Sequence, residues 1–179
     1  MACTLTTGRL EPCKESVGGL TKVYFVNFGT MGTVGYTASS DEVASVAGSP
    51  DAYQYDLKGT SSFEQTITSS RENGTTFYDQ ILNLTFKKLD KQTHDEIALL
   101  VAARPHVVIE DNNGNLFLAG IEYGMDVNGG TIVTGAAMGD LSGYTLTLQG
   151  MEKKPANFLA SDLASVGFSV SASQINPSA

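Results

Sequence analysis

Two histidines and two cysteines are the residues of this chain best suited to metal or nucleophilic chemistry. A zinc site would need all four to converge, yet neither pair has a recognised ligand spacing; they are His94, His106, Cys3 and Cys13. A hydrolase would instead need a pocket that joins one of the histidines to a carboxylate. No serine-nucleophile or phosphate-loop motif accompanies them. We therefore expect no enzymatic activity, no metal and no cofactor, and keep a small hydrolase as a second alternative.

Two glycine-containing runs have the composition of ligand-binding loops but lack the required spacing. The run 29–35, GTMGTVG, follows a predicted strand, whereas a dinucleotide loop needs Gly-x-Gly-x-x-Gly followed directly by a helix. The run 111–114, DNNG, has its glycine at the fourth position, whereas an EF-hand calcium loop needs it at the sixth. We therefore interpret the first run as a flexible loop and the second as a hairpin turn.

The charged residues are unevenly distributed along the chain. Acidic residues number 19 against 11 basic ones, a formal net charge of −8, which argues against an electrostatic grip on nucleic-acid phosphates. No lysine or arginine occurs between Pro105 and Glu152, and this segment contains the acidic residues that we predict to line a channel: Glu110, Asp111, Glu122, Asp126 and Asp140. Other positions carry the basic residues that we predict to contact a neighbouring subunit: Arg71, Lys87, Lys88, Lys91 and Arg104.

Such an asymmetry suits self-association, because a basic face of one copy can meet an acidic face of the next. It also suits a ring whose acidic inner wall repels DNA phosphates and so lets DNA slide through. An ordinary solvated acidic surface is the alternative interpretation.

Most of the elements that must position these residues are predicted to be strands. Apolar and polar residues alternate over 53–57, 77–88 and 144–149, and 23–28 is a short β-branched and aromatic run. Two Asn-Gly pairs, which suit tight type I′ turns, predict hairpins that join 63–70 to 75–88 and 107–110 to 116–119.

One helix is predicted over about residues 90–103. Asp90 is a suitable N-cap, Pro105 stops the helix, and the apolar stripe consists of Ile97, Leu100 and Val101. A single helix on an otherwise antiparallel sheet or barrel makes the expected fold mainly β, of the α+β class.

The ends of the chain differ from the middle, so we expect an N-terminal arm (1–18), a β domain (19–154) and a C-terminal arm (155–179). The arms lack periodicity, but apolar residues in the C-terminal arm predict that this arm packs against another surface, such as that of a neighbouring copy. Glycines are dense over 120–143, where they permit sharp bends and close approach of backbones.

No apolar run approaches the roughly 20 residues needed to cross a bilayer. The start has no secretory pattern, and we expect no membrane anchor. Two cysteines are too few for a disulfide scaffold and indicate a reducing compartment, with a Cys3–Cys13 bond as an open alternative.

Three runs carry a resemblance to a known family: 69–77 (SSRENGTTF), 112–120 (NNGNLFLAG) and 123–144. With them the chain resembles small virion proteins of tailed bacteriophages, in particular those of phages of Bacteroidetes hosts, including the crAss-like phages. The similarity covers about 1–20 and 57–158. In that group such proteins look like tail-tube or tail-ring subunits, which implies an antiparallel β-barrel or sandwich of the tail-tube type with one flanking helix. These signatures carry no catalytic residues.

The expectation from the resemblance and the charge pattern together is a structural subunit of a phage tail tube or tail ring. Copies would close into a ring, most simply a hexamer or a multiple of six, around a channel through which DNA passes without specific binding. Neighbouring tail or neck proteins would be further partners, and the protein would be assembled in the host cytoplasm and reside in the virion tail. The alternative is a virion surface decoration or receptor-binding module, whose aromatic patch would come from Tyr36, Tyr53 and Tyr55.

Overall fold

The computed structural model describes residues 7–11, 13–38 and 40–176, and their fold is mainly β. The helices are α1 (Lys91–Ala102) and α2 (Leu163–Val166). The strands are β1 (Leu20–Val26), β2 (Val34–Tyr36), β3 (Val43–Val46), β4 (Asp51–Asp56), β5 (Ser62–Ser70), β6 (Thr75–Lys87), β7 (His106–Asp111), β8 (Leu116–Ala119), β9 (Asp126–Val133), β10 (Gly143–Glu152), β11 (Asn157–Phe158) and β12 (Ser169–Val170). Neither helix in this part of the chain is long and apolar enough to cross a membrane.

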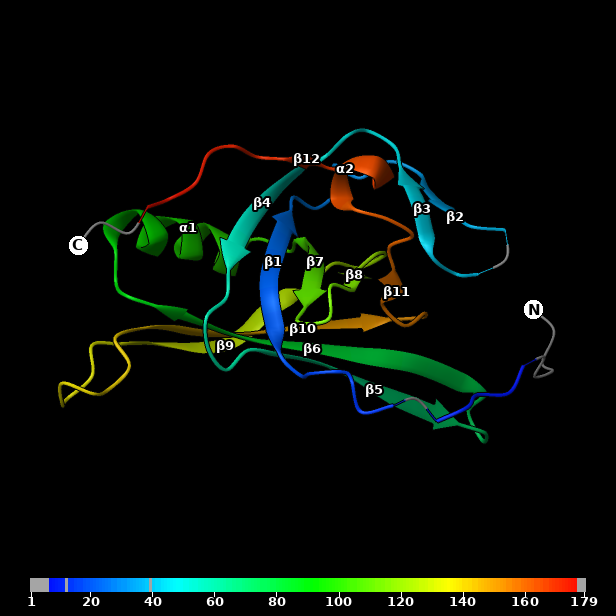
Figure 1. The fold of residues 1–179 in the computed structure, drawn as a ribbon, viewed down its shortest axis with the longest axis horizontal. Coiled ribbons are helices and arrows are strands. Elements are labelled where there is room, and N and C mark those ends of the chain that lie inside the picture. Colours follow the sequence, from blue (N-terminus) through cyan, green and yellow to red (C-terminus); the bar gives the residue numbers. More distant parts are fainter. Residues whose placement is uncertain (1–6, 12, 39, 177–179) are drawn as a thin grey trace.

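The strands form three layers. A six-stranded sheet, in the order β11-β8-β7-β1-β4-β12, lies over a four-stranded sheet in the order β5-β6-β10-β9, and the strands of the two sheets cross at a steep angle (Figure 1). The β2–β3 hairpin and α2 form a smaller layer on the opposite side of the six-stranded sheet. The prediction of a mainly β fold is confirmed. The sheets of the described residues have open edges and do not close into a barrel.

The main core lies between the two large sheets. On β6, Leu82, Leu84 and Phe86 alternate with polar residues, and each pairs across the ladder with an apolar residue of β10. These side chains pack against the inner faces of β1 and β7, and α1 covers the same core; the facing residues include Val23, Phe25, Val107, Ile109, Ile97 and Leu100. The period of two in the sequence therefore marks the buried face of the four-stranded sheet correctly.

A second core covers the other face of the six-stranded sheet. Tyr24 and Val26 of β1 point into it, so β1 is buried on both faces from Val23 to Val26, and this stretch has no polar side to alternate with. Much of the cover comes from the C-terminal segment, through Leu159, Leu163, Val166 and Phe168. In addition, β11 pairs with β8, and β12 pairs in parallel with β4. The predicted C-terminal arm thus docks on its own chain.

Helix α1 forms where the sequence predicts it. The Asp90 carboxylate accepts hydrogen bonds from the backbone N–H groups of Gln92 and Thr93, at 3.1 and 3.3 Å, and so satisfies two donors of the first turn. Ile97 and Leu100 are buried as expected. The prediction for Val101 is wrong, since this side chain is exposed and Thr93 is buried in the stripe.

Both predicted hairpins are confirmed, but their connections are longer than the two residues of the type I′ turns that the Asn-Gly pairs predict. The β5–β6 pairing ends at Ser70 and Thr75, so four residues form the connection, with Gly74 at a φ of 62°. In the β7–β8 hairpin, Asp111 holds a four-residue connection in shape, and Gly114 has a φ of 82°. In each case the glycine supplies the left-handed backbone, but it closes a longer loop than a type I′ turn.

We expect Asp90→Ala to lower the free energy of unfolding by about 1 kcal/mol, because two N–H groups at the start of α1 would lose their acceptor. Urea denaturation followed by circular dichroism measures the change. Asp95→Ala, an exposed carboxylate on the same helix, is the matched control and should change the free energy by less than about 0.5 kcal/mol. Equal losses in the two variants would contradict the capping role.

Candidate functional site

The outer face of the four-stranded sheet is an extended polar surface, which we call the polar face. Its side chains are the alternate residues that point away from the main core; many are threonine, asparagine or glutamine, and Phe77, Ile81 and Met151 lie among them. On β6, β10 and β9 they include Asp79, Asn83, Thr85, Thr145, Thr147, Gln149, Thr131, Asn128 and Asp126. Such a face can meet water or a hydrated ligand without apolar cover.

Side-chain hydrogen bonds run across the strands of the polar face. Asn128 on β9 donates to Gln149 Oε1 on β10 at 2.7 Å, and Gln149 Nε2 donates to both carboxylate oxygens of Asp79 on β6, at 2.7 and 2.9 Å. One row further along, Thr147 Oγ1 donates to Asn83 Oδ1 at 2.9 Å. These bonds restrict the rotamers of the exposed side chains, so the polar face has a defined arrangement of donors and acceptors.

Two segments project beyond the body at opposite ends of this sheet (Figure 1). Strand β10 pairs with β6 from Tyr78 to Lys87, so the β5–β6 hairpin continues past it, and Ile67 on this hairpin is largely exposed. At the other end, the loop from β9 to β10 carries Met138, which is fully exposed. Asp140 shapes this loop by accepting the N–H groups of Ala136 and Ala137.

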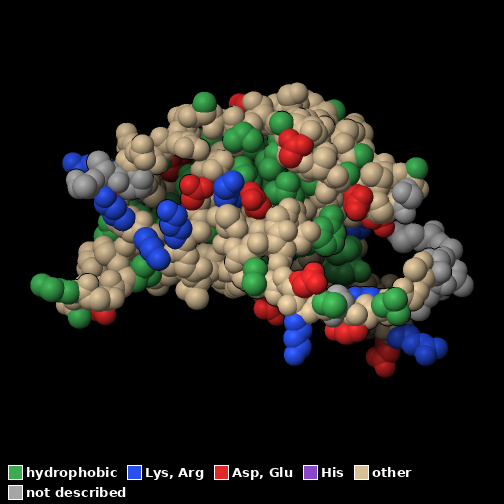
Figure 2. All heavy atoms as spheres, viewed as in Figure 1, with side chains coloured by type: hydrophobic (Ala, Val, Ile, Leu, Met, Phe, Trp, Pro, Cys, Tyr) green, Lys and Arg blue, Asp and Glu red, His purple; other side chains and the backbone are tan. Residues whose placement is uncertain are grey.

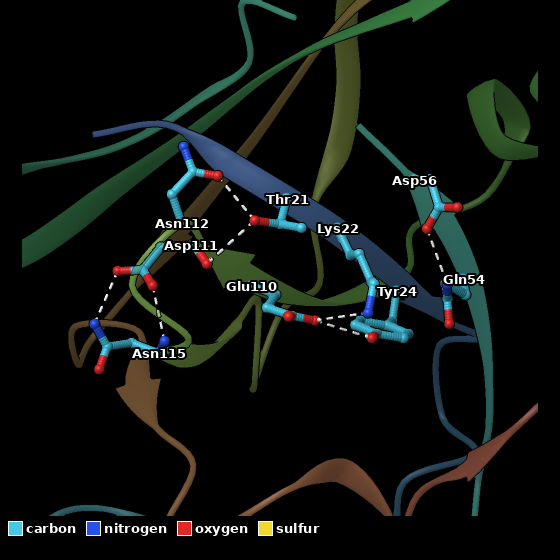
Figure 3. Close-up of polar contacts among 9 residues, drawn as sticks. All are labelled: Thr21, Lys22, Tyr24, Gln54, Asp56, Glu110, Asp111, Asn112 and Asn115. Atoms are coloured by element: carbon cyan, nitrogen blue, oxygen red, sulfur yellow. Dashed lines mark hydrogen bonds and ion pairs between the residues drawn. The ribbon is translucent and has the colours of Figure 1, made fainter. Parts of the chain in front are cut away.

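The structure separates the five acidic residues predicted to line a channel. Figure 3 shows Glu110 on β7 beside β1, where its carboxylate lies 3.7 Å from Lys22 Nζ and accepts a hydrogen bond from Tyr24 at 3.1 Å. Burial, reinforced by Glu110, raises the pKa of Tyr24. Glu122 forms an ion pair with Lys153 at 3.0 Å. Glu110 and Glu122 are thus paired with cations of the same chain.

Two more of the five build turns. Asp111 accepts the N–H group of Asn113 at 2.9 Å. It also accepts the N–H group and the side-chain amide of Asn115, at 2.7 and 2.9 Å (Figure 3). Partial burial acts against the charge, but these hydrogen bonds prevail and lower the pKa of Asp111. Hydrogen bonds from Ala137 and Ala136 lower the pKa of Asp140. Only the fifth of the predicted residues, Asp126, lies on the polar face.

The five predicted basic residues also fall into separate places. Lys87, Lys88 and Lys91 lie together where β6 ends and α1 begins, whereas Arg71 lies in the hairpin turn at the opposite end of β6. Arg104 follows α1, with its guanidinium 4.1 Å from the centre of the Phe28 ring. Figure 2 shows lysine and arginine side chains gathered at the end of the molecule where Figure 1 places the start of α1. We call this the lysine end.

His106 is a structural residue in this fold. It is buried, its ring stacks on Phe28 at 5.0 Å, and both of its nitrogens contact backbone groups. Nε2 accepts the N–H of Gly29 at 3.4 Å, so Nδ1 carries the proton and donates to the Gly120 carbonyl at 2.6 Å. Burial lowers the pKa of His106, the Gly120 hydrogen bond opposes this, and the charge of Arg104 adds to it.

The other residues considered for chemistry do not converge either. His94 is exposed on α1. In the described part of the chain neither histidine forms a hydrogen bond or ion pair with a carboxylate. No group of three or more metal-ligating residues was found there. Cys13 is an exposed free thiol, and Cys3 lies outside the described residues.

The three tyrosines proposed as an aromatic patch lie in different surroundings. Tyr55 packs against Phe25 and Phe86 in the main core, with ring centres 5.2 and 5.5 Å apart. Tyr53 is on the same strand, β4, and is exposed. Tyr36 lies in the smaller layer, where Lys154 Nζ is 4.7 Å from its ring centre. The structure therefore does not assemble these residues into one binding surface.

A pocket that the sequence analysis missed lies at the far end of β10. It has a volume of about 200 Å³ and is lined by Tyr36, Gln80, Ile121, Glu122, Glu152, Lys154 and Pro155. Glu152 is 4% exposed and Gln80 is 1% exposed. A signal was present, because Glu152 continues the inward series of β10 after Tyr144, Leu146 and Leu148.

The Glu152 carboxylate is held by backbone groups. Its Oε1 accepts the N–H groups of Glu122 and Tyr123 at 3.0 and 2.8 Å, while Gln80 Oε1 accepts that of Gly120 at 2.9 Å. Burial raises the pKa of Glu152 in spite of these two hydrogen bonds; the nearby charge of Glu122 acts in the same direction as burial, and the charge of Lys153 acts against it. This pocket therefore contains a carboxylate that is poorly compensated for its burial.

Comparison with protein-family models, with curated proteins and with solved structures gave no match.

We expect the stability to fall as the pH drops below about 6.5, the ordinary pKa of histidine, because the unfolded chain then binds a proton that His106 resists in the fold. The contribution of this one group is at most about 1.4 kcal/mol per pH unit.

In His106→Asn this part of the pH dependence should disappear, while His94→Asn, at an exposed position, should keep it. Urea midpoints measured from pH 7.5 to 5 give the three slopes. A slope in His106→Asn equal to that of the wild type would contradict the role given to His106.

Proposed function

We propose that this protein is a structural subunit of a phage tail tube or tail ring, whose copies assemble into a closed ring around a channel for DNA. The observation that carries the proposal is the polar face, an ordered hydrophilic sheet surface that is flanked at both ends by projecting segments with exposed apolar side chains. The resemblance to virion proteins of tailed phages supports the choice of a tail.

The polar face is the surface that we propose to line the channel. Its threonine, asparagine and glutamine side chains are hydrogen-bonded to one another, and its carboxylates include Asp79, Asp126 and Glu64. A face with these carboxylates and Lys87 at its end has little positive charge with which to hold phosphates. DNA can then pass without binding, which is the property that a conducting channel needs.

The open edges of the four-stranded sheet supply the contacts between copies in this proposal. Strands β5 and β9 are its outer strands, and such edges present unpaired backbone groups to another chain. Head-to-tail contacts of this kind give a ring if the rotation closes, most simply a hexamer or a multiple of six. Neighbouring tail or neck proteins would contact the two rims of the ring in the virion tail, after assembly in the host cytoplasm.

Sedimentation velocity and negative-stain microscopy of the purified full chain test this proposal. We expect rings or tubes with a central hole, and a reconstruction should place the polar face on the inner wall. A stable monomer at high concentration would contradict the ring, and a reconstruction with the polar face outside would contradict the channel lining.

We expect Ile67→Ser and Met138→Ser each to weaken assembly by about tenfold or more, because each removes an apolar side chain from a projecting segment at no cost to the core. The concentration of half-assembly, measured by light scattering, gives the change. Leu99→Ser is the matched control, since Leu99 on α1 is 64% exposed against 65% for Ile67. If Leu99→Ser weakened assembly as much as the other two, the projecting segments would not be the contact sites.

A further inference from the structure

The pocket at Glu152 contains a carboxylate that forms no ion pair within the described residues, although Lys154 lines the same pocket. Oε1 accepts two backbone N–H groups, and among the described residues no hydrogen bond or ion pair reaches the second oxygen, Oε2. The side chain is more than nine-tenths buried and lies in the wall of the pocket. A buried carboxylate is stabilised strongly when a positive charge is placed beside it.

The two lysines that follow Glu152 in sequence are directed elsewhere. Lys153 Nζ lies 3.0 Å from Glu122 and 5.4 Å from the centre of the Tyr123 ring. Lys154 Nζ lies over the Tyr36 ring. Lys153 is thus paired with Glu122 and Lys154 with the Tyr36 ring, and neither lysine forms an ion pair with Glu152.

The walls of the pocket define the kind of cation that fits. Ile121 and Pro155 offer apolar surface to an alkyl stem, and Glu152 in the same lining has one carboxylate oxygen, Oε2, that accepts no hydrogen bond from the described residues. A guanidinium group prefers two carboxylate oxygens side by side, but Oε1 is already occupied by two N–H groups. A metal ion would need several oxygen ligands. An ammonium group on an aliphatic chain fits both features, because its chain can contact the apolar walls and its charged end can donate to the single oxygen.

We propose that this pocket is a binding site for an alkylammonium group, supplied by a lysine side chain from the lysine end of a second copy. The source rests on the proposed function, since it requires copies to meet end to end along β10, as they would where one ring of a tube stacks on the next. The register of β10 places the two partners at opposite ends of the subunit, because Gly143 pairs with Lys87 at one end and Glu152 pairs with Tyr78 at the other. Nine residues of strand separate them by about 30 Å.

Lysines are available at that end of the molecule. Lys87 and Lys91 are exposed and form no ion pair within the described residues. Stacking one subunit on the next along β10 brings this positive end towards the pocket of its neighbour. The contact is heterologous, since the two surfaces differ, and it can therefore be repeated from copy to copy.

The first test uses n-butylammonium as a probe, at a protein concentration where sedimentation shows monomers. Proton–nitrogen spectra should show saturable shifts of the Glu122 and Tyr123 amides, which donate to Glu152. Glu152→Gln should lower the affinity by at least about tenfold, and Glu64→Gln, an exposed carboxylate on β5, should leave it unchanged. n-Butanol, with the same stem and no charge, should give no saturable shift. Absence of n-butylammonium binding to the wild type would overturn the ammonium site.

The second test measures assembly by light scattering. Glu152→Gln and the double variant Lys87→Gln with Lys91→Gln should each raise the concentration of half-assembly by at least about tenfold, while Lys14→Gln in the N-terminal arm should not. Binding of n-butylammonium with unchanged assembly of both variants would overturn the second copy as the source of the group. Failure of the wild type to assemble would refute the proposed function and this source together, while the first test would still decide the pocket.

Discussion

The ten-residue pairing of β6 with β10 is the constraint on which the rest of this molecule depends. Because side chains alternate along a strand, one register places Leu82 opposite Leu148 in the main core and Asn83 opposite Thr147 on the polar face. A slip by one residue would bury the polar row and expose the apolar one. The same register fixes the two ends of β10, and so determines that the Glu152 pocket and Lys87 lie at opposite ends of the sheet.

Local patterns in the sequence predict much of the fold but little of the candidate site. The alternation over 77–88 and the cap at Asp90 depend on neighbours in the chain, so β6 and α1 form where they are predicted. The docking of the C-terminal segment depends on a surface made by β1, β7 and β8, which no short pattern reveals. The widths of the hairpin turns depend on hydrogen bonds such as those of Asp111, which the Asn-Gly pair does not specify.

The acidic segment shows most clearly why charge in a sequence does not locate a surface. The partners of Glu110 are Lys22 and Tyr24 on β1, more than eighty residues away in the chain. Asp111 and Asp140 serve the backbone of their own turns. The distribution of charges along the chain does not predict which of these partners lie close together in the fold. The alternation of β10 did contain the position of Glu152, because a carboxylate on the inward side of a buried strand must find compensation.

The covering of β1 by the C-terminal segment has a consequence for synthesis on the ribosome. Residues 20–152 can pair their large sheets before the segment with Leu159, Leu163 and Phe168 has left the exit tunnel. During that interval one face of the six-stranded sheet, with Val26, Val108 and Leu118, is covered only in part, by residues of the β2–β3 hairpin such as Val43 and Val46. The nascent chain therefore exposes apolar surface until α2 packs on this face and β12 pairs with β4. Chaperone binding during translation would be directed to this face.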